Sequence, residues 1–337
     1  ERVLAGCVAA LSNAVTTLQP ASMTLLEVPV DPAGLVTDTR KPLVYDPDLR
    51  WMLFREPGTG AVLGSIVGWA NHPETPWSGN TEITADFCGV IRDGLERGIR
   101  YGDSVRRPGL GGTHVFINGA VGGLMTTSPS VTVRDPFLDE DFSKPSHEKT
   151  RALGHQLVRR LLDAVETPAG QTPASTVTVP IAVQARTLRI PLDNRNFVLA
   201  GMIGLLDRGH SPWMHIRTEV AVLRIGDASV ACIPGEIYPE LVNGGVVRAP
   251  GGDFDIEPLE VPPIRELMPG RVKFLFGLAN DEIGYIIPKS EWDTRAPHLY
   301  GADHAPYGEV NSAGPDTAYL LHSAVRELIP LAWPEAR

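Results

Sequence analysis

Three residues of metal-binding type stand after apolar, strand-like runs. His72 follows the run that ends at Ala70, Glu236 follows Ile233-Pro234-Gly235, and Tyr285 follows the run that ends at Ala279. Imidazole nitrogen and carboxylate oxygen are zinc ligands, and a catalytic zinc site keeps one position for water. The combination therefore makes a zinc site that activates water one hypothesis for this chain.

Each of the three residues also has a simpler interpretation. A histidine at the end of a strand is often a hydrogen-bonded structural residue. Glu236 could stabilise the first turn of a helix that begins beside it. Tyr285 could be a packing residue of the core. His304, beside Asp303 and three residues before Tyr307, is a further candidate for an active site.

The elements that must position these residues follow from the spacing of apolar residues. The sequence predicts strands over 25–30, 51–54, 61–70, 114–118, 219–225, 228–233 and 272–279. It predicts helices over 3–18, 83–99, 148–166 and 316–328, with another that starts near 236. Gly226-Asp227 is a pair suited to a tight hairpin turn. The first helix is amphipathic, and we expect its apolar face to pack on another element.

Strands and helices neither alternate strictly nor segregate along the chain. This order predicts an α/β (mixed α+β) layered domain with a large mixed β-sheet flanked by helices. The 337 residues are 43% hydrophobic, which suffices for a substantial core. We therefore expect one catalytic domain over residues 1–337.

Composition argues against nucleic acid as a partner and against a segment that spans a membrane. The formal net charge is -10, from 30 basic and 40 acidic residues, and no basic cluster stands out. Nucleic acid is not an expected partner, because phosphate binding needs a concentrated basic surface. No apolar run approaches the roughly 20 residues that span a bilayer, so any membrane contact would be peripheral. The oligomeric state does not follow from the sequence.

Familiar nucleophile and nucleotide motifs do not occur in the sequence. There is no GxSxG elbow, HExxH pair, Walker loop or Rossmann glycine fingerprint. Serine hydrolases of the α/β-hydrolase type, helical zinc proteases and nucleotide-binding enzymes therefore lose support.

Four short motifs, in this order, resemble segments of the neutral/alkaline (non-lysosomal) ceramidase family. They are Asn71-His72-Pro73 with Asn80 to Phe87, Pro234-Gly235-Glu236, Leu278-Ala279-Asn280 through Gly284-Tyr285, and Tyr307-Gly308-Glu309 with Ser312 to Pro315. The resemblance covers nearly the whole chain. It implies that His72, Glu236 and Tyr285 are ligands of Zn²⁺. It also implies that Tyr307 and Arg40, within Asp38-Thr39-Arg40-Lys41-Pro42, contact the substrate carbonyl or its developing oxyanion.

The chain departs from the family pattern at two places. The family has another histidine ligand upstream of the helix that opens this chain, so we expect an N-terminal segment to be missing. The family segment Asn-x-Gly-Asp-x-Ser-Pro stands here as Asn118 to Thr126, with Gly123 in place of the aspartate and Met125 in place of the serine. Methionine is not a nucleophile. A route through metal-activated water survives this change, with the general acid and base unassigned.

The resemblance implies a zinc-dependent hydrolase that cleaves an amide (N-acyl, ceramide-like) bond of a small-molecule or lipid-like substrate. It also suggests a secreted or periplasmic location. We expect no C-terminal immunoglobulin-like domain, because the chain ends at Arg337 soon after the last predicted helix. A non-catalytic protein with this fold and an esterase are the alternatives.

Overall fold

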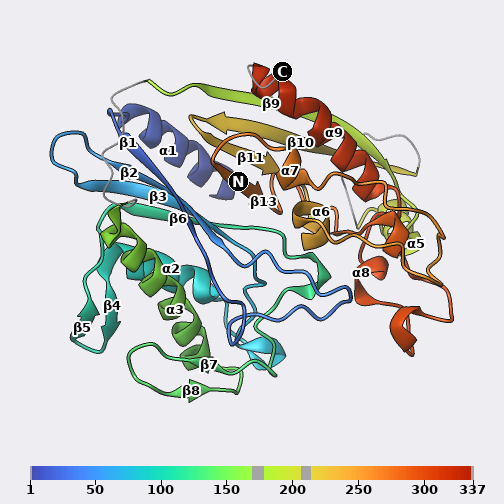
Figure 1. The fold of residues 1–337 in the computed structure, drawn as a ribbon, viewed down its shortest axis with the longest axis horizontal. Helices are drawn as coiled ribbons and strands as arrows, with labels where there is room; N and C mark the ends of the chain where they lie inside the picture. The colour runs from blue at the N-terminus through green and yellow to red at the C-terminus, as the bar shows by residue number, and fades with distance from the viewer. Residues whose placement is uncertain (1, 169–177, 206–213, 335–337) are drawn as a thin grey trace.

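The computed structural model describes residues 2–168, 178–205 and 214–334 of the chain. Two four-stranded sheets stack face to face at its centre (Figure 1). We call residues 2–168 the first half and the described residues from 178 onward the second half. The sheet of the first half has the order β1-β2-β3-β6. Its strands are β1 (Ser22–Val28), β2 (Leu49–Arg55), β3 (Val62–Trp69) and β6 (Thr113–Asn118).

The sheet of the second half has the order β13-β11-β10-β9 and repeats the pairing of the first. In each sheet, three successive strands pair antiparallel, and the last strand joins the third in parallel. The two strands of each parallel pair, β3 with β6 and β11 with β13, therefore end at the same edge. The strands are β9 (Ile181–Pro191), β10 (His215–Ile225), β11 (Ala228–Cys232) and β13 (Val272–Phe276).

Helices cover the outer face of each sheet, which gives four layers (Figure 1). The first sheet is covered by α2 and α3, and the second by α9. The helices are α1 (Arg2–Thr16), α2 (Asp86–Arg97), α3 (His147–Glu166), α5 (Arg195–Met202), α6 (Pro239–Asn243), α7 (Ile264–Leu267), α8 (Tyr307–Val310) and α9 (Thr317–Ala332). The described residues also form three two-stranded pairs: β4 (Ile99–Tyr101) with β5 (Ser104–Arg107), β7 (Val133–Arg134) with β8 (Asp141–Phe142), and β12 (Glu236–Ile237) with β14 (Tyr285–Ile286).

The central strands are apolar on both faces because each sheet lies between two layers. In β2, Trp51 and Leu53 pack with the helices of the first half, while Met52 belongs to the core between the sheets. In β10, Val220 packs toward α9, while Ala221 faces the first sheet. Side chains alternate between the faces of a strand, so a strand covered on both sides has a nearly continuous apolar sequence.

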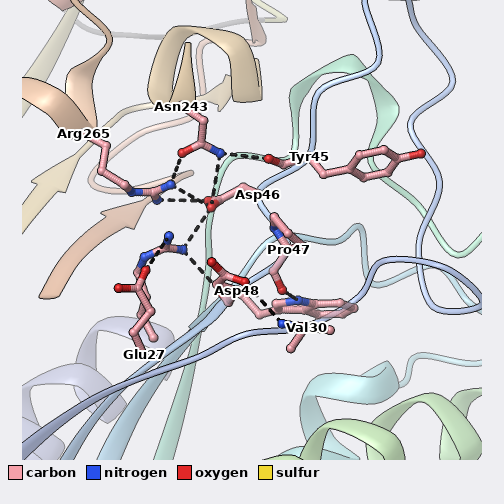
Figure 2. A network of polar contacts seen from close by, with 10 residues as sticks. Glu27, Val30, Tyr45, Asp46, Pro47, Asp48, Asn243 and Arg265 are labelled. Atoms are coloured by element: carbon pink, nitrogen blue, oxygen red, sulfur yellow. Dashed lines mark hydrogen bonds and ion pairs between the residues drawn. The ribbon is translucent and has the colours of Figure 1, made fainter. Parts of the chain in front are cut away.

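A polar network centred on the buried Asp46 joins the two halves beside the sheets (Figure 2). The Asp46 carboxylate accepts hydrogen bonds from Arg50 Nη1 at 2.9 Å and from Arg265 Nη1 at 2.8 Å. Arg50 also forms an ion pair with Glu27, at 3.1 Å. Arg265 in α7 donates to the side-chain oxygen of Asn243 in α6. We call Asp46, Arg50, Arg265 and Asn243 the junction network, since one carboxylate holds arginines of both halves.

Local sequence explains the best-predicted elements. The helix predicted over 148–166 is α3, and the Ser146 hydroxyl caps it by accepting a hydrogen bond from the Lys149 backbone N–H at 3.2 Å. The predicted hairpin is β10–β11, and Gly226 in its turn has a φ of +61° that glycine adopts without strain. The mixed α/β class is confirmed, while the predicted large sheet is divided into two stacked sheets of the same pairing.

The prediction that the first helix packs on another element is wrong. The helix itself forms, as α1, but none of its described residues is buried. Leu4 is 69% exposed and Leu11 is 68% exposed. The apolar periodicity therefore predicted the helix correctly but its packing incorrectly. Periodicity shows that a helix has an apolar face, and it does not show whether another element packs on that face. In the described ranges, no helix combines the length and the apolar character needed to cross a membrane.

Candidate active site

The candidate site lies where the parallel strand pairs of both sheets end. The Gly277 backbone N–H, just after β13, donates a hydrogen bond to the Asn118 carbonyl at the end of β6, at 2.9 Å. A side chain at Gly277 would clash with the Gly119 carbonyl, so glycine permits this close approach. The segments that follow β3, β6, β11 and β13 are thus brought together, although they are far apart in the sequence.

His72 is held by a backbone carbonyl of the segment that follows β6. Its backbone N–H donates to the Met125 carbonyl at 2.9 Å, and its ring Nδ1 lies 2.8 Å from the same oxygen. A carbonyl oxygen only accepts hydrogen bonds, so Nδ1 carries the proton of this contact. The carbonyl fixes the ring orientation and turns Nε2 toward the second half.

The Glu236 carboxylate contacts Nε2 of the His72 imidazole. Its Oε2 lies 2.6 Å from His72 Nε2, and both side chains are largely buried. Burial on its own would lower the pKa of His72, but the hydrogen bond and negative charge of Glu236 outweigh it and raise that pKa above its ordinary value. The pair is therefore a charge-assisted contact between the two halves of the molecule.

Glu236 and Tyr285 are register partners in the short parallel pair of β12 and β14. Partners in a parallel pair carry their side chains on the same side, so both reach the same imidazole. The Tyr285 hydroxyl lies 3.5 Å from His72 Nε2. Burial and the charge of Glu236 raise the pKa of Tyr285. The helix predicted to start near Glu236 starts instead at Pro239, as α6, which leaves Glu236 in a strand.

Tyr307 lies at the edge of this group, at the start of α8. Its ring centroid is 5.8 Å from that of Tyr285, with the two rings nearly perpendicular. Tyr307 is 57% exposed to solvent. His304, the further candidate, is exposed before α8 begins. The structure thus brings Glu236 and Tyr285 to one edge of the His72 imidazole, and Tyr307 packs against Tyr285.

Arg40 is engaged by protein groups beside this cluster. Its Nη1 and Nη2 donate to the two carboxylate oxygens of Glu309 at 2.7 Å each, and Nη2 also donates to the Glu291 carbonyl at 2.8 Å. The guanidinium lies 5.1 Å from the centre of the Tyr238 ring. Tyr238 in turn packs edge-on against Tyr285, with ring centroids 6.2 Å apart. Arg40 therefore contacts the site through Tyr238 and Glu309.

Asp38 shapes the loop that carries Arg40. Its carboxylate accepts hydrogen bonds from the backbone N–H groups of Arg40 and Val44, both at 3.0 Å. Burial raises the pKa of Asp38 to about 6. A side chain at Gly123 would begin 3.0 Å from Asp38 Oδ1. An aspartate at position 123 would thus bring a second carboxylate against Asp38, which gives a physical reason for glycine there.

The donor set can be tested against a metal ion. Among the residues that the structure describes, no group of three or more His, Cys, Asp or Glu side chains could hold one. Tyr285 would therefore have to be the third ligand beside His72 and Glu236. The ring orientation fits, because Nδ1 donates to a backbone carbonyl and Nε2 faces the other two donors, as in other histidine zinc sites. One imidazole nitrogen and two oxygens form a set that zinc accepts.

Sequence reasoning missed three contributors to this site. Met125 contributes a backbone carbonyl, which leaves no signature in a sequence, while its side chain is fully buried in the core of the first half. Tyr238, buried between Arg40 and Tyr285, stands two residues after Glu236. Glu309 stands within the Tyr307-Gly308-Glu309 motif, and its position in that motif was the one signal that could have marked it.

Comparison with known proteins supports the fold. No protein-family model and no curated protein sequence matches this chain. The crystal structure of neutral ceramidase from Pseudomonas aeruginosa matches with a TM-score of 0.66 and 16% identity, over 98% of this chain and 55% of that chain. A structure described as ceramidase complexed with C2 matches with a TM-score of 0.65 and 14% identity, over 96% and 55%.

The chain thus spans about half the length of these solved structures. At such identities the likeness establishes the fold, which is that of the neutral ceramidases. The resemblance found in the sequence motifs is confirmed at this level.

Proposed function

We propose that this chain is the catalytic part of a zinc-dependent hydrolase that cleaves the amide bond of an N-acyl, ceramide-like substrate. The fold of the neutral ceramidases supports the class of reaction. The site supports it independently, since its residues come from both halves and converge on one point. We further propose a lipid-like small-molecule substrate and a secreted or periplasmic location, as the resemblance implies.

One observation carries the proposal. His72 Nε2 lies 2.6 Å from Glu236 Oε2 and 3.5 Å from the Tyr285 hydroxyl, and Nδ1 is tied to the Met125 carbonyl. Three potential ligand atoms from three distant segments meet, and the Met125 carbonyl orients the imidazole so that Nε2 faces the other two. A packing role alone would not require this combination of atoms.

Two groups of residues have different roles: one would hold the zinc ion, and the other stabilises the negative charge that develops on the substrate oxygen. His72, Glu236 and Tyr285 would hold the ion, and the Met125 carbonyl keeps the imidazole in place. A bound zinc ion supplies an activated water and polarises the substrate carbonyl. Tyr307, accessible beside Tyr285, donates its hydroxyl proton in a hydrogen bond to the oxygen that gains negative charge. Removal of one such donor typically slows a reaction by about 10²- to 10³-fold.

Attack by water is favoured over attack by a protein nucleophile at position 125. The Met125 side chain is fully buried and packs with the core of the first half. A thioether can neither be deprotonated nor form an acyl intermediate that water later releases. The site residues that do face the imidazole are suited to ion binding and to hydrogen bonding.

Metal content and hydrolysis together test the proposal. We expect about one zinc per chain in the full-length protein by elemental analysis, with release of fatty acid from an N-acyl sphingosine. His72→Ala and Glu236→Ala should each lose the zinc and at least about 10³-fold in kcat/KM, because each removes a ligand. The control is His147→Ala, which removes an exposed histidine of α3.

The outcome also separates the alternatives. Zinc with hydrolysis of an O-acyl analogue alone would identify an esterase. A protein that holds no zinc and cleaves neither substrate would be a non-catalytic protein of this fold.

A further inference from the structure

Arg40, Glu309 and the Glu291 carbonyl form a closed group, which we call the Arg40 clamp. Both terminal nitrogens of Arg40 donate to Glu309 at 2.7 Å, and Nη2 also donates to the Glu291 carbonyl at 2.8 Å. The Arg40 side chain is 13% exposed, and that of Glu309 is fully buried. Two parallel N–H···O bonds fix both the distance and the orientation of the two groups.

The clamp leaves the guanidinium poorly placed to bind a substrate carbonyl. One face of the guanidinium lies over the Tyr238 ring, with 5.1 Å to the ring centre. Its terminal nitrogens are aimed at Glu309 and Glu291. A substrate oxygen would have to compete with a buried, charged and bidentate partner, which would leave the Glu309 carboxylate without its counter-charge in a buried place.

Glu309 is the part of the clamp that reaches the active site, because it lies in α8, two residues after Tyr307. Helix α8 has four residues, and a helix this short is not stable by itself. Its position therefore depends on tertiary contacts. Besides Arg40, Glu309 Oε1 accepts a hydrogen bond from the Asp293 backbone N–H at 3.1 Å. Gly308 lies against the Tyr238 hydroxyl, where any side chain would clash.

The same helix presents the exposed Tyr307 ring against Tyr285. Tyr307 has one ring contact on the site side, and the backbone that carries it is anchored on the other side by Glu309. We propose that Arg40 is a positioning residue that sets the place of Tyr307 through Glu309 and does not touch the substrate. The kinetic consequence rests on the proposed function, while the structural consequence for α8 does not.

Hydrogen exchange tests the structural part. Arg40→Met removes both the charge and the paired N–H donors of the guanidinium. Arg40→Lys keeps the charge but cannot donate two parallel hydrogen bonds to Glu309. We expect peptides that cover 305–312 to exchange at least about 10-fold faster in both variants, and peptides around His72 and Tyr285 to remain unchanged. Lys41→Met, which removes the exposed neighbouring cation, is the control. Unchanged exchange over 305–312 in both Arg40 variants would overturn the inference.

Kinetics test the catalytic part. We expect Arg40→Met and Glu309→Gln each to lower kcat by about 10- to 100-fold with KM changed by less than about 3-fold, since a displaced donor weakens the transition state more than binding. The decisive comparison is made in a protein that already carries Tyr307→Phe. If Arg40 acts through Tyr307, adding Arg40→Met to Tyr307→Phe lowers kcat by no more than about 2-fold further.

Effects of Arg40→Met and Tyr307→Phe that multiply in full would overturn the inference, because they would mean that Arg40 acts on the substrate separately. If the wild-type protein hydrolysed no N-acyl amide, the proposed function would fail. Hydrogen exchange over 305–312 would then still decide whether Arg40 holds α8. The two failures are therefore distinguishable.

Discussion

The two halves of the molecule have the same strand pairing but supply different chemical groups to the candidate site. Each has three antiparallel strands and a fourth that joins the third in parallel, with helices on the outer face. After its parallel pair, the first half supplies an imidazole, His72, and the carbonyl that orients it. The second half supplies a carboxylate, Glu236, and a phenol, Tyr285. The pairing sets where the strands end, and the segments beyond the strands set the chemistry.

Buried carboxyl groups of the molecule also differ in whether their surroundings favour the charged or the protonated form. At the junction, the Asp46 carboxylate lies between Arg50 and Arg265. In the second half, Glu240 and Glu291 are both buried near each other, and burial raises the pKa of each. A carboxylate between two arginines keeps its charge, whereas two buried carboxyl groups side by side favour a proton. This contrast predicts opposite responses to mutation and to pH.

The largest effect should come from breaking the junction network. Asp46→Ala leaves Arg50 and Arg265 without their shared partner in a largely buried place. Breaking a buried ion pair from one side costs about 3 to 5 kcal/mol, and we expect a loss of that size in the free energy of unfolding. Urea denaturation at pH 7 measures it. Asp141→Ala, which breaks an exposed pair with Arg134, should cost less than about 1 kcal/mol.

The charge of Asp46 also has a predictable pH window. Burial raises the pKa of Asp46, but Arg265 and Arg50 outweigh it and lower that pKa to about 2. A lowered pKa stabilises the folded state above the ordinary value near 4, and this contribution is lost as the pH falls toward 2. Asp46→Asn should therefore cost about 2 kcal/mol at pH 7, and its deficit should shrink as the pH falls below 4.

Glu291 should respond with the opposite sign. Its side chain faces Glu240, Glu260 and Arg40, and burial raises its pKa to about 7. The folded state then keeps a proton that the unfolded chain releases above its ordinary pKa. The stabilising contribution is complete below about 4.5 and is lost as the pH rises through 7.

Glu291→Gln removes this titration and leaves an amide oxygen that can still accept the Val247 N–H. We expect the variant to equal the wild type at pH 4.5 and to be more stable at pH 8 by on the order of 2 to 3 kcal/mol. Denaturation at a series of pH values measures the difference. A Glu291→Gln protein that is less stable than the wild type at pH 8 would contradict a protonated Glu291.

The smallest effect is expected in α1, whose apolar face is exposed. Leu11→Ser should change the free energy of unfolding by less than about 0.5 kcal/mol, because the side chain contacts little. Leu157→Ala in α3, where the side chain is fully buried, should cost about 2 to 5 kcal/mol. A loss above 1 kcal/mol in Leu11→Ser would mean that α1 is covered in solution.

Several features were predictable from the sequence because they depend on neighbours along the chain. The α3 helix follows from its leucine spacing and its Ser146 cap, and the β10–β11 hairpin follows from Gly226-Asp227. The candidate residues after the strands were also recognisable, since His72 and Tyr285 follow apolar runs. Short-range periodicity and turn chemistry act within a few residues, so the sequence contains them in full.

Other features depend on contacts between distant segments. The division into two stacked sheets, the exposure of α1 and the register of Glu236 beside Tyr285 come from packing of the whole chain. The partners of Arg40 and the Met125 carbonyl that orients His72 belong to the same class.

The sequence by itself thus determined the mixed α/β class and the residue types of the candidate site with their order along the chain. Which atoms are in contact depends on the tertiary structure, in which the Arg40 guanidinium donates to the Glu309 carboxylate. The physical reason is that a hydrogen bond depends on distance and direction in space, whereas sequence spacing constrains these only over a few residues.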